Sequence, residues 1–132
     1  MFELTVESGF SAAHALVIQG EPETLHGHDW RVSVTVAGPT LDRDGLLCDF
    51  HAIESALADV TGRLHNQNLN QIEPFDRLNP SAEHVAQHIA EELSRRLVGV
   101  LPAGVRLASV LVTEAPGCAA IYRPDEGAHA SP

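Results

Sequence analysis

The chain has 132 residues and a mass of 14.1 kDa, a size that suits one domain with a single core and is too small for two. Hydrophobic residues make up 44%, and no apolar run reaches the roughly 18 residues of a membrane span, so we expect a cytoplasmic protein. The 18 acidic residues against 8 arginines, without lysine, give a net charge of −10, which argues against nonspecific nucleic-acid or membrane binding.

Two segments near the start alternate apolar and polar residues with the period of a half-buried strand, at 2–10 and 30–38. We expect them to pair antiparallel and to be joined by a long loop over 11–29. Loops of this length are uncommon in compact domains unless they carry function. This one contains three of the chain's eight histidines.

Further along the chain, apolar residues recur with the spacing of an α-helix in two segments. Asp49 is placed to cap the first helix, and Asn79 to cap a second over about 80–98 with Pro80 at its first position. The apolar stripes of the two predicted helices are Ile53, Leu57, Val60 and Leu64, and Val85, Ile89, Leu93 and Leu97.

Two further strands are predicted at 105–115 and 118–124, around a Pro-Gly turn. The order of elements, ββααββ, predicts an α+β fold with two helices on one face of a four-stranded antiparallel sheet. We expect a single domain over 1–124 and a disordered tail at 125–132. Open sheet edges in so small a domain favour pairing between copies of the chain.

Histidines at 14, 26 and 28 are candidate metal ligands. In a strand, His26 and His28 point to the same side, so two imidazoles can converge on one ion. A catalytic zinc site needs three protein ligands and an open position, and His14 is the natural third. The alternative interpretation of His-Gly-His is an incidental surface pair.

Several motifs, in their order and spacing, resemble the 6-pyruvoyl-tetrahydropterin synthase and 6-carboxytetrahydropterin synthase family. They are FSAAH (10–14), LHGHDW (25–30), DF (49–50), NPSAEHVA (79–86), and VTEA with IYR (112–123). The resemblance implies the tunnelling fold (T-fold), in which three subunits close a barrel and two trimers stack. It also implies Zn²⁺ bound by His14, His26 and His28.

The resemblance further implies a small-molecule pterin substrate, 7,8-dihydroneopterin triphosphate. Zinc would act as a Lewis acid on the substrate's side-chain hydroxyls. By position, Glu114 would anchor the pterin ring through a two-point carboxylate contact, although it could be a surface charge at a strand end. Ser81 and Glu83 would line the pterin site, and Ser81 could equally be a residue that starts a helix.

The chain departs from the family at the residue that acts as nucleophile or base. Family members that make 6-pyruvoyl or 6-carboxy products carry a cysteine shortly before His-Gly-His, and this chain has none there. Glu23 lies three residues before His26, which is similar to a subgroup that produces 6-hydroxymethyl-7,8-dihydropterin, a folate precursor. A carboxylate can serve as a general base, so we expect Glu23 to be catalytic, with Glu21 as a less well placed rival.

A second departure affects the aspartate-histidine pair that relays protons in the family. This chain has His65 and Asn66 in those positions. His65 could titrate in place of the pair, or it could be a helix-end histidine favoured by the helix dipole.

The favoured function is therefore a zinc-dependent carbon–carbon or carbon–oxygen lyase that cuts the side chain of 7,8-dihydroneopterin triphosphate. The alternatives are a 6-carboxytetrahydropterin synthase-like lyase with a different base, and a catalytically silent paralogue that binds a pterin or purine-like ligand. The expected assembly is a homo-oligomer, either a trimer or a dimer of trimers.

Overall fold

A computed structural model describes residues 1–124, so the predicted disorder of the tail at 125–132 lies outside the described residues. The elements follow one another as β1 (Phe2–His14), β2 (Val17–Ile18), β3 (Glu21–Pro22), β4 (His26–Gly38), α1 (Phe50–Leu64), β5 (Gln67–Asn68), the 3-10 helix η1 (Leu69–Gln71), α2 (Ala82–Leu97), β6 (Arg106–Ala115) and β7 (Cys118–Tyr122). Within the described part of the chain, no helix is long and apolar enough to cross a bilayer.

The main sheet has five strands in the order β5-β1-β4-β6-β7. The four long strands pair antiparallel, as the sequence predicts, and the α+β prediction is confirmed. The two-residue strand β5 was not predicted, and it pairs parallel with Ala12 and Ala13 of β1. Two polar residues give no alternation, so such a strand leaves no signal in the sequence.

The predicted loop over 11–29 is wrong, because most of it is strand. β1 continues to His14 and β4 begins at His26, and these two residues face each other in the register. The extension was missed because Ala12, Ala13 and Gly27 do not alternate in polarity as a half-buried strand does. Only residues 15–25 leave the sheet, and they contain the small hairpin of β2 and β3.

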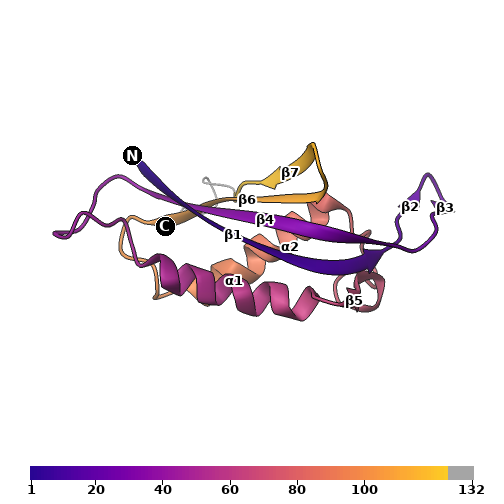
Figure 1. The fold of residues 1–132 in the computed structure, drawn as a ribbon. Helices are drawn as coiled ribbons and strands as arrows, with labels where there is room; N and C mark the ends of the chain where they lie inside the picture. Colours follow the sequence, from indigo (N-terminus) through magenta and orange to yellow (C-terminus); the bar gives the residue numbers. More distant parts are fainter. Residues whose placement is uncertain (125–132) are drawn as a thin grey trace.

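Both helices pack on one face of the sheet, as expected (Figure 1). All eight residues of the predicted helix stripes are buried, and Asp49 caps α1 by accepting a hydrogen bond from the His51 amide at 2.9 Å. The predicted cap of α2 is wrong, because Ser81 rather than Asn79 accepts the amide hydrogen bond of His84, at 3.1 Å.

The other face of the sheet carries polar side chains in pairs across β1 and β4. Thr5 and Thr35 share a hydrogen bond at 3.0 Å, Ser33 donates to Glu7 at 3.1 Å, and Ser11 donates to Asp29 at 2.6 Å. The two faces differ because successive residues of a strand alternate sides. The helix-facing side forms the core, and the opposite face presents hydroxyls and carboxylates.

Candidate metal centre and surrounding site

Three histidines converge at the end of the sheet where β1 finishes and β4 starts. The register places His14 opposite His26, and His28 projects to the same face because it lies two residues further along β4. One ring nitrogen from each of the three lies within 4.8 Å of the others, so the group could hold a metal ion. The side chain of His14 is 1% exposed, that of His28 24% and that of His26 40%, which leaves the group open on one side.

Backbone carbonyls fix which nitrogen of two rings carries the proton. His14 Nδ1 lies 2.7 Å from the Pro80 carbonyl oxygen, and His26 Nδ1 lies 2.8 Å from the Thr24 carbonyl oxygen. A carbonyl only accepts, so each Nδ1 donates its hydrogen, and in the neutral form of each ring Nε2 is the nitrogen that presents a lone pair. This is the arrangement in which metal-binding histidines are held by their second nitrogen.

Glu114 on β6 is directed at two of these rings, those of His14 and His28. Its Oε2 lies 3.2 Å from His14 Nε2 and 3.9 Å from His28 Nε2. Both Oε2 and His14 Nε2 are buried and make no hydrogen bond within the described residues. With Nδ1 donating to the Pro80 carbonyl, the neutral His14 ring turns its Nε2 lone pair toward this carboxylate oxygen, and a cation beside the two atoms would satisfy both. The residues present therefore fit a divalent metal ion.

Trp30 forms the inner wall of the centre. Its ring is fully buried, and its centroid lies 5.0 Å from that of His14 and 5.9 Å from that of His28, both edge-on. The indole nitrogen donates to the Ala12 carbonyl at 3.2 Å, and the ring stacks on Phe10 at 5.6 Å. The imidazoles thus rest against a rigid aromatic surface that limits how their side chains can turn.

Glu23 lies at the base of the β2–β3 hairpin, beside the histidines. Its Oε1 accepts the Leu16 amide hydrogen at 2.9 Å and lies 4.0 Å from His26 Nε2. Glu21, the rival from the sequence, is exposed within β3. The structure therefore brings Glu23 to the metal centre, and no contact of Glu21 with the three histidines is seen in residues 1–124.

His65 and Ser81 both take part in local structure. His65 is the C-cap residue of α1, is exposed, and its Nδ1 accepts the Ser11 amide hydrogen at 3.1 Å. Ser81 caps α2, and Glu83 is exposed in the first turn of that helix. Roles of these three residues in catalysis or pterin binding stay predictions.

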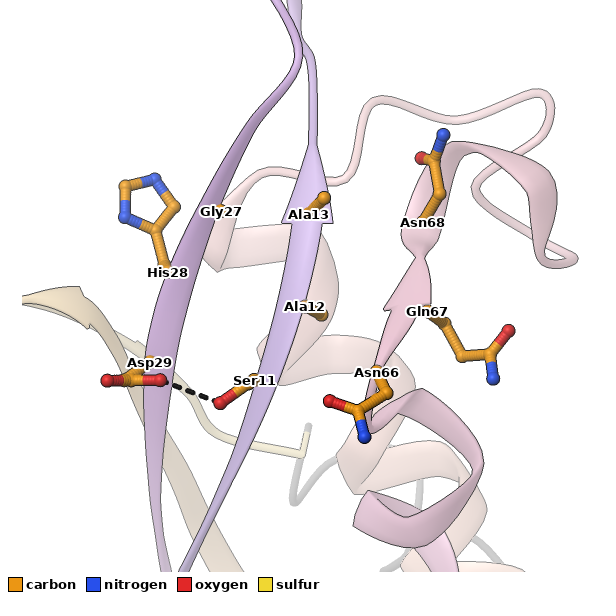
Figure 2. Close-up of a pocket in the computed structure, with 9 residues that line it drawn as sticks. All are labelled: Ser11, Ala12, Ala13, Gly27, His28, Asp29, Asn66, Gln67 and Asn68. Carbon is orange, nitrogen blue, oxygen red and sulfur yellow. Dashed lines mark hydrogen bonds between the residues drawn. The ribbon is translucent and has the colours of Figure 1, made fainter.

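A groove of about 550 Å³ includes one of the three histidines, His28, in its lining. Figure 2 shows Ser11 and Asp29 hydrogen-bonded to each other on neighbouring strands, with Asn66 and Gln67 across from them. The lining residues are Ser11, Ala12, Ala13, Gly27, His28, Asp29, Asn66, Gln67 and Asn68. The lining is rich in hydroxyl and amide groups, which suits a hydrogen-bonding ligand.

Sequence reasoning missed the groups that orient the histidines. The carbonyls of Thr24 and Pro80 have no side-chain signature, and Trp30 looks like any buried strand residue. The side chain of Asn79 was interpreted as a helix cap, whereas it bonds the backbone of Val17.

Comparison with known proteins shows the family of the chain. Residues 3–125 match the family model of 6-pyruvoyl tetrahydropterin synthase. The chain is 33% identical over 132 residues to the 6-carboxy-5,6,7,8-tetrahydropterin synthase of Bacillus subtilis (strain 168), covering 96% of this chain and 88% of that protein.

Solved structures share the fold. The 6-pyruvoyl tetrahydropterin synthase of Caenorhabditis elegans has a TM-score of 0.76 at 23% identity, covering 95% of this chain and 98% of that one. The 6-pyruvoyl tetrahydropterin synthase of Plasmodium vivax has a TM-score of 0.76 at 22% identity, covering 94% and 98%. These likenesses confirm the predicted T-fold, and with the family match and the Bacillus relative they place the chain in the 6-pyruvoyl tetrahydropterin synthase family.

Proposed function

We propose that the protein is a zinc-dependent lyase that cuts the side chain of 7,8-dihydroneopterin triphosphate and releases 6-hydroxymethyl-7,8-dihydropterin. The family supports an enzyme of the pterin synthase type. The observation that carries the specific activity is the Glu23 carboxylate, 4.0 Å from His26 Nε2 in a chain with no cysteine at that place. A carboxylate at this position can take a proton from a substrate that binds at the histidines.

His14, His26 and His28 are the residues that would hold the ion. A donor set of three imidazoles with an open side is typical of catalytic zinc. When bound, zinc supplies Lewis-acid stabilisation of a developing negative charge on a substrate oxygen. The carbonyls of Pro80 and Thr24 keep two of the rings in the tautomer that binds metal.

Proton transfer and pterin binding are assigned to other side chains of the chain. Glu23 Oε1 is already held by the Leu16 amide, which leaves its second oxygen to accept a proton from a substrate hydroxyl. Glu114, the last residue but one of β6, lies against His14, and its carboxylate can accept hydrogen bonds from the pterin amino and ring N–H groups. Ser81, Glu83 and His65 are proposed as secondary residues, at the pterin site and as a proton carrier.

A solved relative supports a glutamate in this role. One structure of the Plasmodium vivax 6-pyruvoyltetrahydropterin synthase is of a variant whose catalytic residue, a glutamate, is replaced by alanine. The Bacillus relative instead favours a second candidate, because it is a 6-carboxy-5,6,7,8-tetrahydropterin synthase at 33% identity. The two candidates differ in the product that leaves the enzyme.

Product analysis by mass spectrometry separates these candidates. Zinc-loaded protein is incubated with 7,8-dihydroneopterin triphosphate, and we expect 6-hydroxymethyl-7,8-dihydropterin, with a loss of about 100-fold or more in rate for Glu23→Gln. The matched control is Glu21→Gln, an exposed glutamate on the same hairpin, which should keep the rate. A 6-carboxy product favours the second candidate, and an undiminished rate in Glu23→Gln removes the proposed base.

We also propose that the protein is cytoplasmic and assembles into trimers or a dimer of trimers. Within residues 1–124, β5 and β7 are the edge strands of the sheet, where backbone groups can pair with other copies. Sedimentation equilibrium gives the mass directly, and a monomer at micromolar concentration would refute the assembly.

A further inference from the structure

Three consecutive residues connect the metal centre to the hairpin that carries Glu23. Ala15 and Leu16 follow His14 directly, and Val17 is the first residue of β2. They run beyond the end of the main sheet, and within residues 1–124 no strand of that sheet pairs with them. Buried or half-buried backbone groups need partners, and here side chains provide them.

Two asparagines each hold one residue of this link with a pair of hydrogen bonds. Asn70 Oδ1 accepts the Ala15 amide hydrogen at 2.8 Å, and its Nδ2 donates to the Ala15 carbonyl at 2.8 Å. Asn79 Oδ1 likewise accepts the Val17 amide hydrogen at 2.9 Å, and its Nδ2 donates to the Val17 carbonyl at 2.8 Å. A primary amide thereby imitates the donor and acceptor of a neighbouring strand.

Leu16 is held from the opposite direction by Glu23. Its amide donates to Glu23 Oε1 at 2.9 Å, and its carbonyl accepts the Glu23 amide hydrogen at 2.9 Å. Successive residues of an extended chain present their backbone groups to alternate sides, which is why Leu16 meets the hairpin while Ala15 and Val17 meet the asparagines. The carboxylate of Glu23 is therefore set by the position of residues 15–17.

Asn79 also lies next to the residue that orients a metal ligand. The Pro80 carbonyl accepts the His14 Nδ1 hydrogen at 2.7 Å, and the Asn79 carbonyl lies 2.7 Å from His84 Nδ1 on α2. Asn79 and Pro80, which lie just before the Ser81 cap of α2, thus contact both parts of the site. Pro80 contacts the histidine centre, and Asn79 contacts the hairpin. The helix start fixes the two parts of the site relative to each other.

We propose that Asn79 is a positioning residue that sets the Glu23 carboxylate against the metal centre, an inference that rests on the proposed role of Glu23. The hairpin has little else to hold it, because β2 and β3 have two residues each, and Val17 and Ile18 are 50% and 54% exposed. Two-stranded hairpins of this size are marginal by themselves. Loss of the Asn79 amide frees Val17, and with it Leu16 and the carboxylate.

The test combines hydrogen exchange with kinetics on the zinc-loaded protein. In Asn79→Ala we expect faster amide exchange over residues 16–23, a kcat about 10- to 100-fold lower, and an unchanged zinc content and KM. Asn79→Asp keeps the acceptor for the Val17 amide and loses the donor to the Val17 carbonyl. Its exchange rates over residues 16–23 and its kcat should therefore lie between those of the unchanged protein and of Asn79→Ala. The midpoint of thermal unfolding shows whether each variant is folded.

Asn70→Ala is the comparison variant, because it removes the same bond pair one residue from His14. It should lower zinc affinity more than Asn79→Ala does. Unchanged exchange over 16–23 in Asn79→Ala would refute the positioning role, and so would a loss of kcat that only follows a loss of zinc. If Glu23→Gln is fully active, the proposed function fails, whereas the exchange result still reports on the contact between Asn79 and the hairpin.

Discussion

Single residues in this site depend on backbone groups that the sequence does not reveal. His14, His26 and His28 could be predicted as ligands because their spacing on strands and their family motifs are visible in the sequence. The carbonyls of Pro80 and Thr24, which choose the tautomer of two rings, could not, since every residue has a carbonyl and only the fold brings these two into place.

Trp30 gives a test of how far the aromatic wall supports the ligands. Trp30→Phe removes the hydrogen bond to the Ala12 carbonyl and part of the surface behind His14. We expect a loss of about 1–3 kcal/mol in the free energy of unfolding and weaker zinc binding. Urea denaturation and metal titration measure the two effects. The control is Phe10→Leu, which changes the residue stacked on Trp30 and should lower stability without weakening zinc binding. Equal effects of the two variants on zinc affinity would contradict the supporting role of Trp30.

Whole elements were predicted well where hydrophobic periodicity is strong, and poorly where small or polar residues form the strand. The stripes of α1 and α2 are buried as predicted. The ends of β1 and β4, the two-residue strand β5 and the cap of α2 were missed. In each case long-range pairing or a local hydrogen bond, rather than periodicity, decides the structure.

The start of α2 can be tested through Ser81, whose hydroxyl caps the helix. Ser81→Ala should cost about 1 kcal/mol of unfolding free energy, because the His84 amide loses its acceptor. Ser81→Asp should restore stability, since aspartate is also a good cap and its charge suits a helix N-terminus. Urea denaturation measures both. If Ser81 also binds the pterin, KM stays raised in Ser81→Asp, and a normal KM there would leave capping as its role.

The long strands and the two helices follow the predicted ββααββ order, with β2, β3, β5 and η1 as short additions, and the helices cover one sheet face. This arrangement could be predicted because the order of strand-like and helix-like periodicity along the sequence leaves only a few possible layer architectures. The side chains of the open face and the position of the groove depend on the pairing of β1 with β4 and with β5, which the sequence does not specify residue by residue.

The pH dependence of the whole molecule's stability should include a contribution from His88, which packs against Phe75. Burial lowers the pKa of His88 below its ordinary value of 6.5, although Glu92 and Glu91 oppose this. The unfolded chain therefore takes up the proton first, and the free energy of unfolding falls as the pH drops below about 6.5 until the folded state also binds it.

His88→Gln should remove this part of the slope between pH 7.5 and 5.5 (about one unit either side of the ordinary histidine pKa). Urea denaturation at both pH values, with a chelator present for both proteins, gives the difference in slope. The chelator matters because metal binding depends on pH, and bound metal would add this dependence to the free energy of unfolding. Identical slopes for the two proteins would show that His88 contributes nothing.

The register of β1 against β4 ties two properties of the chain to one event. The pairing that sets Val6 opposite Val34 in the core also sets His14 opposite His26. A slip of one residue would turn one strand's side chains to the other face, which would expose valines and separate the imidazoles together. An ion that needs all three histidines can bind only a correctly paired sheet, so metal uptake during folding would select the native pairing over its nearest mispaired competitors.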